Sequence, residues 1–204
     1  MGDLTQAVAE LFARVTEALE RATWALLHAD VELAATVVAA DADIDARTAA
    51  LTEAVWELVD ADDPGRPALR ELVCLLLVLP ELERSADLAE HIAQRARHDL
   101  GAAMTPASRG IVARMGEVAV EMWQATATAY RTSRVDGNEL DQDDEELDIL
   151  HDRLTAEVAA GAMDPAAAAQ VVLVARFYER LGDHAVNLAR RAERLRPPCT
   201  PPRR

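Results

Sequence analysis

Three oxygen-bearing side chains are spaced one helical turn apart near the end of the sequence. They are Glu179, Asp183 and Asn187, within the segment 176–189. Positions i, i+4 and i+8 share one face of an α-helix, so a helix here aligns two carboxylates and an amide along one ridge. Such a ridge is either a solvated surface or a set of ligands for a hard cation.

A similar segment occurs earlier, at residues 83–93. Both copies read Glu-Arg-x-x-Asp-x-Ala-x-(His/Asn)-(Ile/Leu)-Ala. Glu83 precedes Glu179, and Asp87 precedes Asp183, by the same 96 positions. A constant offset with matching residue types indicates a duplicated structural unit.

Each half also carries a second acidic pair with i, i+4 spacing. Asp41 and Asp45 form it in the first half, and Asp144 and Asp148 form it 103 positions later. This offset exceeds the first by about two helical turns, which a shorter helical connection in the second half would absorb. Each half therefore contains two helices with paired carboxylates one turn apart.

Paired carboxylates on neighbouring antiparallel helices can point into one groove, where they repel each other unless a cation neutralises them. Oxygen ligands favour Mg, Ca, Mn or Fe, and an added imidazole favours Fe, Mn or Zn. His91, at i+4 from Asp87, and His151, at i+3 from Asp148, could complete such sites, as could Asn187. One acidic pair alone is usually a solvated face; two pairs in each half at constant offsets favour a metal site.

The composition predicts an all-α fold. Of 204 residues, 50% are hydrophobic but only 3% are aromatic, and 28% are charged, which is typical of helical bundles. The formal net charge of −15 argues against nucleic acid as a partner, because phosphate contacts need a basic face. It suits a metal site or a partner with a basic surface.

Apolar periodicity and turn signals divide the chain into six long helices. We expect them near residues 4–29, 30–58, 68–98, 106–131, 139–160 and 165–195, with a kink or local break at Pro80. They form two antiparallel three-helix bundles in tandem, at residues 1–100 and 101–196, followed by a Pro-rich flexible tail at 197–204. Asp30 and Asp164 are expected as N-caps, and Gly161 as the residue ending a helix.

The sequence predicts a cytoplasmic protein. Cys74 and Cys199 match neither a disulfide framework nor a zinc site. The acidic, polar start is no signal peptide, and the longest apolar run, residues 72–79, is too short to span a bilayer.

The segment Glu-Arg-Leu-Gly-Asp-His-Ala-Val-Asn-Leu-Ala at 179–189 resembles the signature of the PhoU family, regulators of phosphate uptake. The copy at 83–93 and the stretch 29–45 leading into Asp41 and Asp45 resemble the same family, and the resemblance covers residues 4–195.

This resemblance implies two three-helix bundles, a homodimer, and a cytoplasmic negative regulator that binds metal through Glu/Asp-x-x-x-Asp stripes. It implies partners too: the ATPase of the phosphate ABC transporter and a sensor histidine kinase, with the membrane reached only through them. We expect no enzymatic activity. We expect the protein to bind metal ions such as Fe, Mn, Zn or Mg. The implied metal ligands are Asp41, Asp45, Glu83, Asp87, Asp144, Asp148, Glu179 and Asp183.

The sequence departs from the family pattern in the first half. Ser85-Ala86 stands where the second copy has Leu181-Gly182, and His91 stands where it has Asn187. The segment 64–70 also lacks the Asp that usually precedes Leu-Arg. The first site is therefore expected to differ from the second in metal or affinity, and the loop near Arg66 in its contacts.

Two alternatives remain open at this stage. A ferritin-like carboxylate-bridged di-iron protein requires Glu-x-x-His on two helices, and the sequence offers only Asp148-x-x-His151. A metal-free helical adaptor would use the acidic faces to dock a basic partner.

Overall fold

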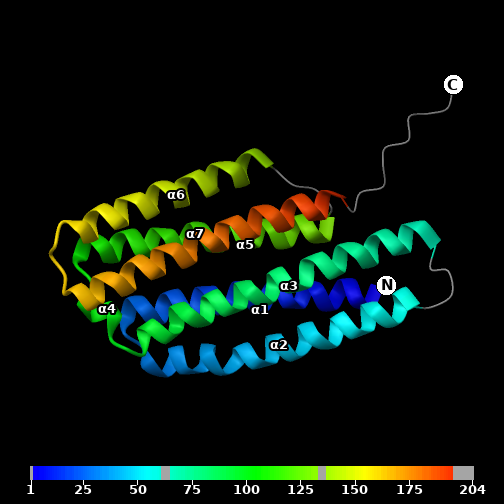
Figure 1. The fold of residues 1–204 in the computed structure, drawn as a ribbon, viewed down its shortest axis with the longest axis horizontal. Helices are drawn as coiled ribbons and strands as arrows, with labels where there is room; N and C mark the ends of the chain where they lie inside the picture. The colour runs from blue at the N-terminus through cyan, green and yellow to red at the C-terminus, as the bar shows by residue number, and fades with distance from the viewer. Residues whose placement is uncertain (1, 61–64, 133–136, 195–204) are drawn as a thin grey trace.

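The computed structural model describes residues 2–60, 65–132 and 137–194. Within these ranges the chain forms seven α-helices and no strand (Figure 1). They are α1 Gly2–His28, α2 Val31–Asp60, α3 Gly65–Ala96, α4 Leu100–Ala103, α5 Pro106–Thr132, α6 Gly137–Ala159 and α7 Pro165–Arg194. The predicted all-α fold with six long helices is confirmed, and the four-residue helix α4 was not predicted.

Local capping groups fix several helix ends. Asp30 Oδ1 accepts a hydrogen bond from the backbone N–H of Leu33 at 2.9 Å, and Asp164 Oδ1 accepts one from that of Ala166 at 2.9 Å. Gly161, after α6, has a φ of 79°, a left-handed conformation that glycine adopts without steric cost. All three predicted end signals are confirmed.

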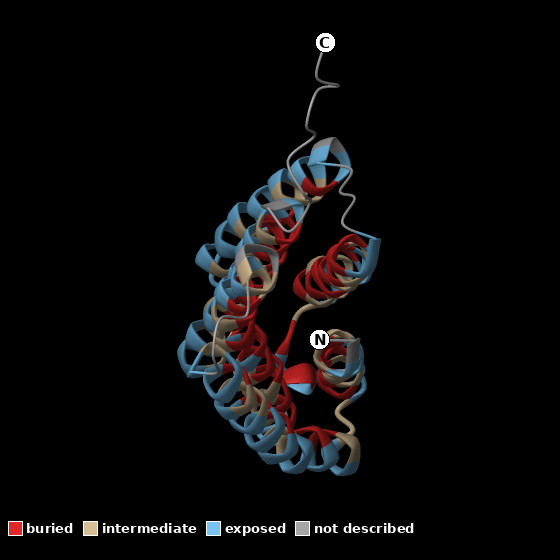
Figure 2. Cartoon of the chain, turned by 90° about the vertical axis from the view of Figure 1, so that its right-hand side faces the viewer, coloured by how far each residue is buried: buried red, intermediate tan, exposed pale blue. Residues whose placement is uncertain are grey.

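The helices form two antiparallel trios that meet along their inner helices. Helix α2 packs on α1 and α3, α6 packs on α5 and α7, and the trios join through α1 against α5 and α3 against α7. The buried faces of the helices turn toward one another and the exposed faces turn outward (Figure 2). The division into repeats at 1–100 and 101–196 stays a prediction, and the predicted tail at 197–204 lies outside the described residues.

The core is apolar, and the polar atoms of its two largest aromatic side chains, Trp123 and Tyr178, have hydrogen-bond partners. The hydroxyl of Tyr178 lies 2.8 Å from Oγ1 of Thr23, and Nε1 of Trp123 donates to the backbone oxygen of Leu181 at 3.1 Å. Both rings are fully buried, so these bonds remove the cost of enclosing a polar atom. In the described part of the chain no helix is long and apolar enough to cross a membrane.

Helix α3 runs through Pro80 without interruption, so of the kink or local break expected there, the break is absent. Proline lacks the N–H that would bond one turn back, and its ring crowds the preceding carbonyls. Nη1 of Arg191, on α7, donates to the backbone oxygen of Leu77, one turn's distance from the proline. This tertiary hydrogen bond is made to the carbonyl next to that of Leu76, the one that the proline leaves without its helical donor.

A buried polar cluster joins the two trios at the α3–α7 contact. Nδ1 of His184 donates to Oε2 of Glu81, and Nη2 of Arg191 lies 3.1 Å from Oε1 of the same carboxylate. Burial raises the pKa of Glu81, but the hydrogen bonds and charges of His184 and Arg191 outweigh it and hold that pKa below its ordinary value. The cluster is charged and paired, and it fixes the register of α3 against α7.

Candidate metal centre

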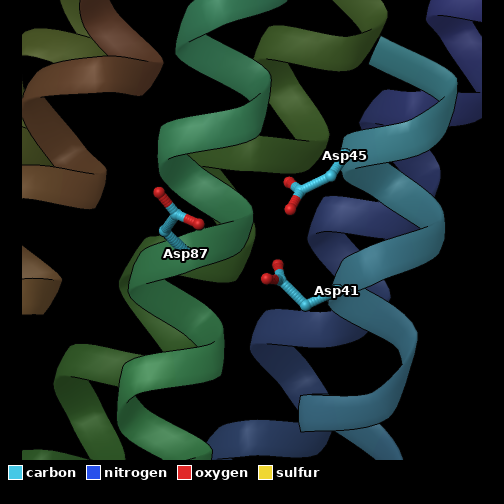
Figure 3. A group of neighbouring side chains, drawn as sticks. All are labelled: Asp41, Asp45 and Asp87. Carbon is cyan, nitrogen blue, oxygen red and sulfur yellow. The ribbon is translucent and has the colours of Figure 1, made fainter. Parts of the chain in front are cut away.

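Three aspartates of the first trio meet in the groove between α2 and α3. Asp41 and Asp45 lie one turn apart on α2, and Asp87 faces them from α3 (Figure 3). One carboxylate oxygen from each lies within 4.8 Å of the others. Asp45 is exposed and the other two are partly buried, so the group opens to solvent at the rim of the groove.

The surroundings of Asp41 disfavour the ionised form of its carboxylate. Burial, followed by the charges of Asp45 and Asp87, raises the pKa of Asp41 to about 7. Its Oδ1 atom is buried and has no hydrogen-bond partner. A buried acceptor without a partner destabilises the fold, and a cation among the three carboxylates would satisfy it. The residues present therefore fit an oxygen-ligated hard cation.

Other acidic residues surround the three aspartates. Glu83, predicted as a ligand, is exposed and adds to the charges that raise the pKa of Asp41. Glu90 contributes more than Glu83, and sequence reasoning missed it. The sequence feature that could have identified Glu90 is its i+3 spacing from Asp87, which places both residues on one face of α3. Oε1 of Glu90 accepts a hydrogen bond from Gln94 at 2.7 Å.

The predicted carboxylates of the second trio are not gathered as closely as the three aspartates of the first trio. Burial raises the pKa of Asp144 to about 6, with further contributions from Asp183 and Asp148 and partial compensation by Arg190. Asp148 and Asp183 are exposed. Among the described residues, only the first trio offers three acidic oxygens within 4.8 Å of one another.

Glu179 forms an ion pair with an arginine of its own helix. Its Oε2 accepts from Nη1 of Arg176, so this carboxylate already has a cationic partner. The helices approach closely at Gly182: a Cβ there would lie 3.0 Å from Oδ1 of Asp144 and 2.7 Å from Cδ1 of Leu147. The absent side chain at position 182 therefore lets the α6 carboxylate reach α7.

Neither of the two candidate histidines has a ring nitrogen in the aspartate group, and the third candidate, Asn187, lies on α7 of the other trio. The ring of His91 stacks on Phe177 of α7 at 5.5 Å between centroids. Nδ1 of His151 lies 3.6 Å from the carboxylate of Asp152, and Asn187 is exposed on α7. The group assembled in the structure is thus made of oxygen ligands alone.

Comparison with known proteins agrees with this architecture. A family model described as the PhoU domain matches residues 8–96 and 112–192, once in each trio. The chain is similar to the phosphate-specific transport system accessory protein PhoU homolog 2 of Mycobacterium tuberculosis, with 32% identity over 94% of this chain and 92% of that protein. It is equally similar to PhoU homolog 1 of Mycobacterium leprae, with 32% identity over 94% of this chain and 88% of that one.

Solved structures of low sequence identity share the fold. PhoU from Pseudomonas aeruginosa superposes with a TM-score of 0.86 at 24% identity, covering 95% of both chains. The phosphate transport system regulatory protein PhoU from Streptococcus pneumoniae gives 0.84 at 20% identity, covering 95% of this chain and 93% of that one. With its family match in both trios and curated relatives along nearly its whole length, the chain belongs to the PhoU family of phosphate-transport accessory and regulatory proteins.

Proposed function

We propose that this chain is a metal-binding, non-enzymatic regulator of phosphate uptake and phosphate signalling. The observation that carries the metal-binding part is the Asp41, Asp45 and Asp87 group, with oxygens within 4.8 Å of one another and one buried oxygen lacking a partner. Three carboxylates in one groove repel one another until a cation neutralises them. The phosphate part rests on family membership and on the names of the relatives.

In this proposal the first site holds its ion through Asp41, Asp45 and Asp87, with Glu83 within reach. The second site draws on Asp144, Asp148, Glu179 and Asp183, after Glu179 leaves its pairing with Arg176. Oxygen-only ligands favour Mg, Mn or Fe, and recruitment of His91 or His151 would favour Fe or Zn.

The protein would act in the cytoplasm as a homodimer. It would connect the ATPase of a phosphate ABC transporter to a sensor histidine kinase as a negative regulator, and reach the membrane only through them. The net charge of −15 supports protein partners with basic surfaces over nucleic acid.

Metal content of the purified, untagged protein tests the first site. We expect bound Mg, Mn, Fe or Zn in the wild type, and loss of about one site's share in Asp41→Asn/Asp87→Asn. The matched control is Glu53→Gln/Glu57→Gln, which removes two exposed carboxylates one turn apart on the same helix α2. Metal content that is the same in all three proteins would rule out the site.

Capture of the transporter ATPase tests the regulatory part. We expect the full-length protein to retain the ATPase, and a chelator or the Asp41→Asn/Asp87→Asn change to reduce retention. Retention that persists unchanged after chelation would support a metal-free adaptor instead. Oxygen consumption by the iron-loaded protein would contradict a non-enzymatic role and favour a di-iron enzyme.

A further inference from the structure

A cavity opens at the end of the bundle where α3 ends, near the label of α4 in Figure 1. It measures about 500 Å³ and lies between the last turns of α3, the short helix α4 and the first turns of α7. This is within the range of small-molecule sites, roughly 300–1,000 Å³. The cavity is at the opposite end of α3 from Gly65, beyond the aspartate group.

One wall of the cavity is cationic and polar. Gln94, Arg95 and His98 line it from α3 and the turn after it, and Gln170 lines it from α7. Small apolar side chains complete the lining: Leu100, Ala103, Ala166 and Ala167. Of the described residues that line the cavity none is acidic, in a chain with 36 acidic and 21 basic residues.

The charge of Arg95 lacks a counter-ion. No carboxylate among the described residues lies within ion-pair distance of its guanidinium, and Glu90 acts on it only from farther away. Nη1 of Arg95 donates to the backbone oxygen of His91 at 3.1 Å, and its guanidinium lies over the ring of Phe177 at 5.0 Å. Nε is buried without a partner.

A half-buried guanidinium without a counter-ion favours an anion from outside the chain, because burial of an unpaired charge is costly. Its planar fork of donors matches the oxygens of phosphate or carboxylate. Here the donors arrive from two helices: Arg95 and His98 from the α3 side, and Gln170 from α7. A tetrahedral phosphoryl group, with three or more acceptor oxygens, can meet both sides at once, whereas a planar carboxylate presents two oxygens.

The acidic residues nearest in sequence to the cavity lining are Asp164 and Asp99, and neither lines the cavity. Asp164 caps α7, where its Oδ1 accepts from the N–H of Ala166 at 2.9 Å and that of Ala167 at 3.4 Å. Asp99 is exposed and precedes α4. The amides at the start of α7 are therefore already capped, and the anion contacts come from the side chains.

We propose that this cavity binds a phosphoryl oxyanion, with Arg95 as its main anchor and with His98 and Gln170 as further hydrogen-bonding groups. The oxyanion is either free inorganic phosphate or the phosphate group of a small organic ester whose body covers the apolar lining. The inference does not depend on the metal-binding proposal, because it uses none of the same residues.

Calorimetric titration of the full-length protein tests this site. The probes are inorganic phosphate, AMP as a phosphate monoester, sulfate and acetate, each in the presence of EDTA so that no metal bridges the anion. We expect phosphate or AMP to bind. Tighter binding of AMP identifies an ester as the ligand class, and binding of phosphate alone identifies the free ion.

Arg95→Gln should weaken this binding at least about tenfold, because it removes a charge-assisted hydrogen bond to the anion. The matched control is Arg97→Gln, which removes an exposed arginine two residues further along the chain and should leave affinity unchanged. Since Arg95 also packs on Phe177, Gln170→Ala at the cavity rim provides a second variant, with an expected loss of about threefold to tenfold.

Three results would overturn the proposal. They are the absence of binding by both phosphate and AMP, equal binding of sulfate or acetate, and an affinity that neither Arg95→Gln nor Gln170→Ala lowers. An equal loss in Arg97→Gln would show a diffuse charge effect and would overturn it as well. Metal content unchanged in Arg95→Gln separates this test from that of the metal site.

Discussion

Glu81 of α3 and His184 of α7 form a hydrogen bond across the junction of the two helix trios. Glu81 lies two residues before Glu83, and His184 directly follows Asp183, so the pair connects two of the four helices that carry predicted metal ligands, one from each trio. The second oxygen of Glu81 lies 3.1 Å from Nη2 of Arg191. The Glu81 carboxylate therefore joins a helix of the first trio to a helix of the second.

Removal of the Glu81 carboxylate should destabilise the fold. Glu81→Ala leaves His184 and Arg191 without their acceptor in a site where the glutamate side chain is only 11% exposed, and we expect a loss of about 2 kcal/mol in urea unfolding at pH 7. Arg84→Ala is the control, because this exposed arginine lies 3.8 Å from the same carboxylate and should cost less than about 0.5 kcal/mol.

The loss should depend on pH with a definite sign. Because the folded pKa of Glu81 lies below its ordinary value, its stabilisation is present above the unfolded pKa and disappears as pH falls through the folded one. The difference between wild type and Glu81→Ala should therefore narrow in acid. A difference that widens below pH 4, or equal losses in Glu81→Ala and Arg84→Ala, would contradict the paired-carboxylate assignment.

Neutralising Asp41 should stabilise the metal-free protein. Its folded pKa of about 7 lies above the unfolded value of about 3.9, so its contribution is present below pH 4 and is lost as pH rises to 7. In EDTA the melting temperature of the wild type should fall over this range, and that of Asp41→Asn should fall less. At pH 8 we expect Asp41→Asn to gain on the order of 1 kcal/mol after allowance for solvent screening.

Asp43→Asn provides the control for this measurement. Asp43 is exposed on the same helix, and the hydrogen bond from Arg47 lowers the pKa of its carboxyl, so its neutralisation should bring no gain. Excess metal should reverse the order of wild type and Asp41→Asn, because only the wild type keeps the full ligand set. If Asp41→Asn were the less stable protein in EDTA at pH 8, the repulsion inferred among the three aspartates would be wrong.

The sequence predicted the elements better than the contacts between them. Helix ends at Asp30, Gly161 and Asp164 follow from local chemistry, because each cap bonds within a few residues. The duplicated acidic spacing predicted a groove shared by Asp41, Asp45, Glu83 and Asp87, and the structure brings together all of these except Glu83. The short helix α4 carries too few residues for a periodic signal, and the hydrogen bond from Arg191 to the backbone oxygen of Leu77, near Pro80, joins residues far apart in the sequence.

Differences between the two trios were harder to predict. Their motifs are nearly the same, yet Glu179 is paired with Arg176 whereas Glu83 has no such partner at i−3, where Pro80 stands. The role of Glu90 depends on how closely α2 approaches α3. Such features arise from tertiary packing, which the spacing of one helix does not encode.

The two predicted sites should bind metal unequally. The first has three assembled oxygens, whereas the second must first release Glu179 from Arg176. We expect stepwise titration with Mn to show a tighter site that is lost in Asp87→Asn and a weaker one that is lost in Asp144→Asn. Arg176→Ala should strengthen the weaker site several-fold, since it frees the glutamate. Two sites of equal affinity, or a tight site unaffected by Asp87→Asn, would contradict this ranking.

The contact between α1 and α5 should tolerate no added carbon at Gly116. A Cβ there would lie 2.4 Å from Cγ2 of Thr23 and 3.0 Å from its Oγ1. Thr23 cannot easily turn away, because its hydroxyl donates to the backbone oxygen of Leu19 at 2.8 Å and contacts the buried hydroxyl of Tyr178. Gly116→Ala should therefore separate the two trios slightly and lower the free energy of unfolding by about 2 kcal/mol.

Gly110 offers the matched control on the same helix α5. An added Cβ there meets no atom within 4 Å, and the residue is exposed. Gly110→Ala should raise the free energy of unfolding by about 0.5–1 kcal/mol, the difference in helix propensity between glycine and alanine. Urea unfolding of both variants measures the contrast. Stabilisation by both substitutions would show that α1 and α5 lie farther apart than the structure places them.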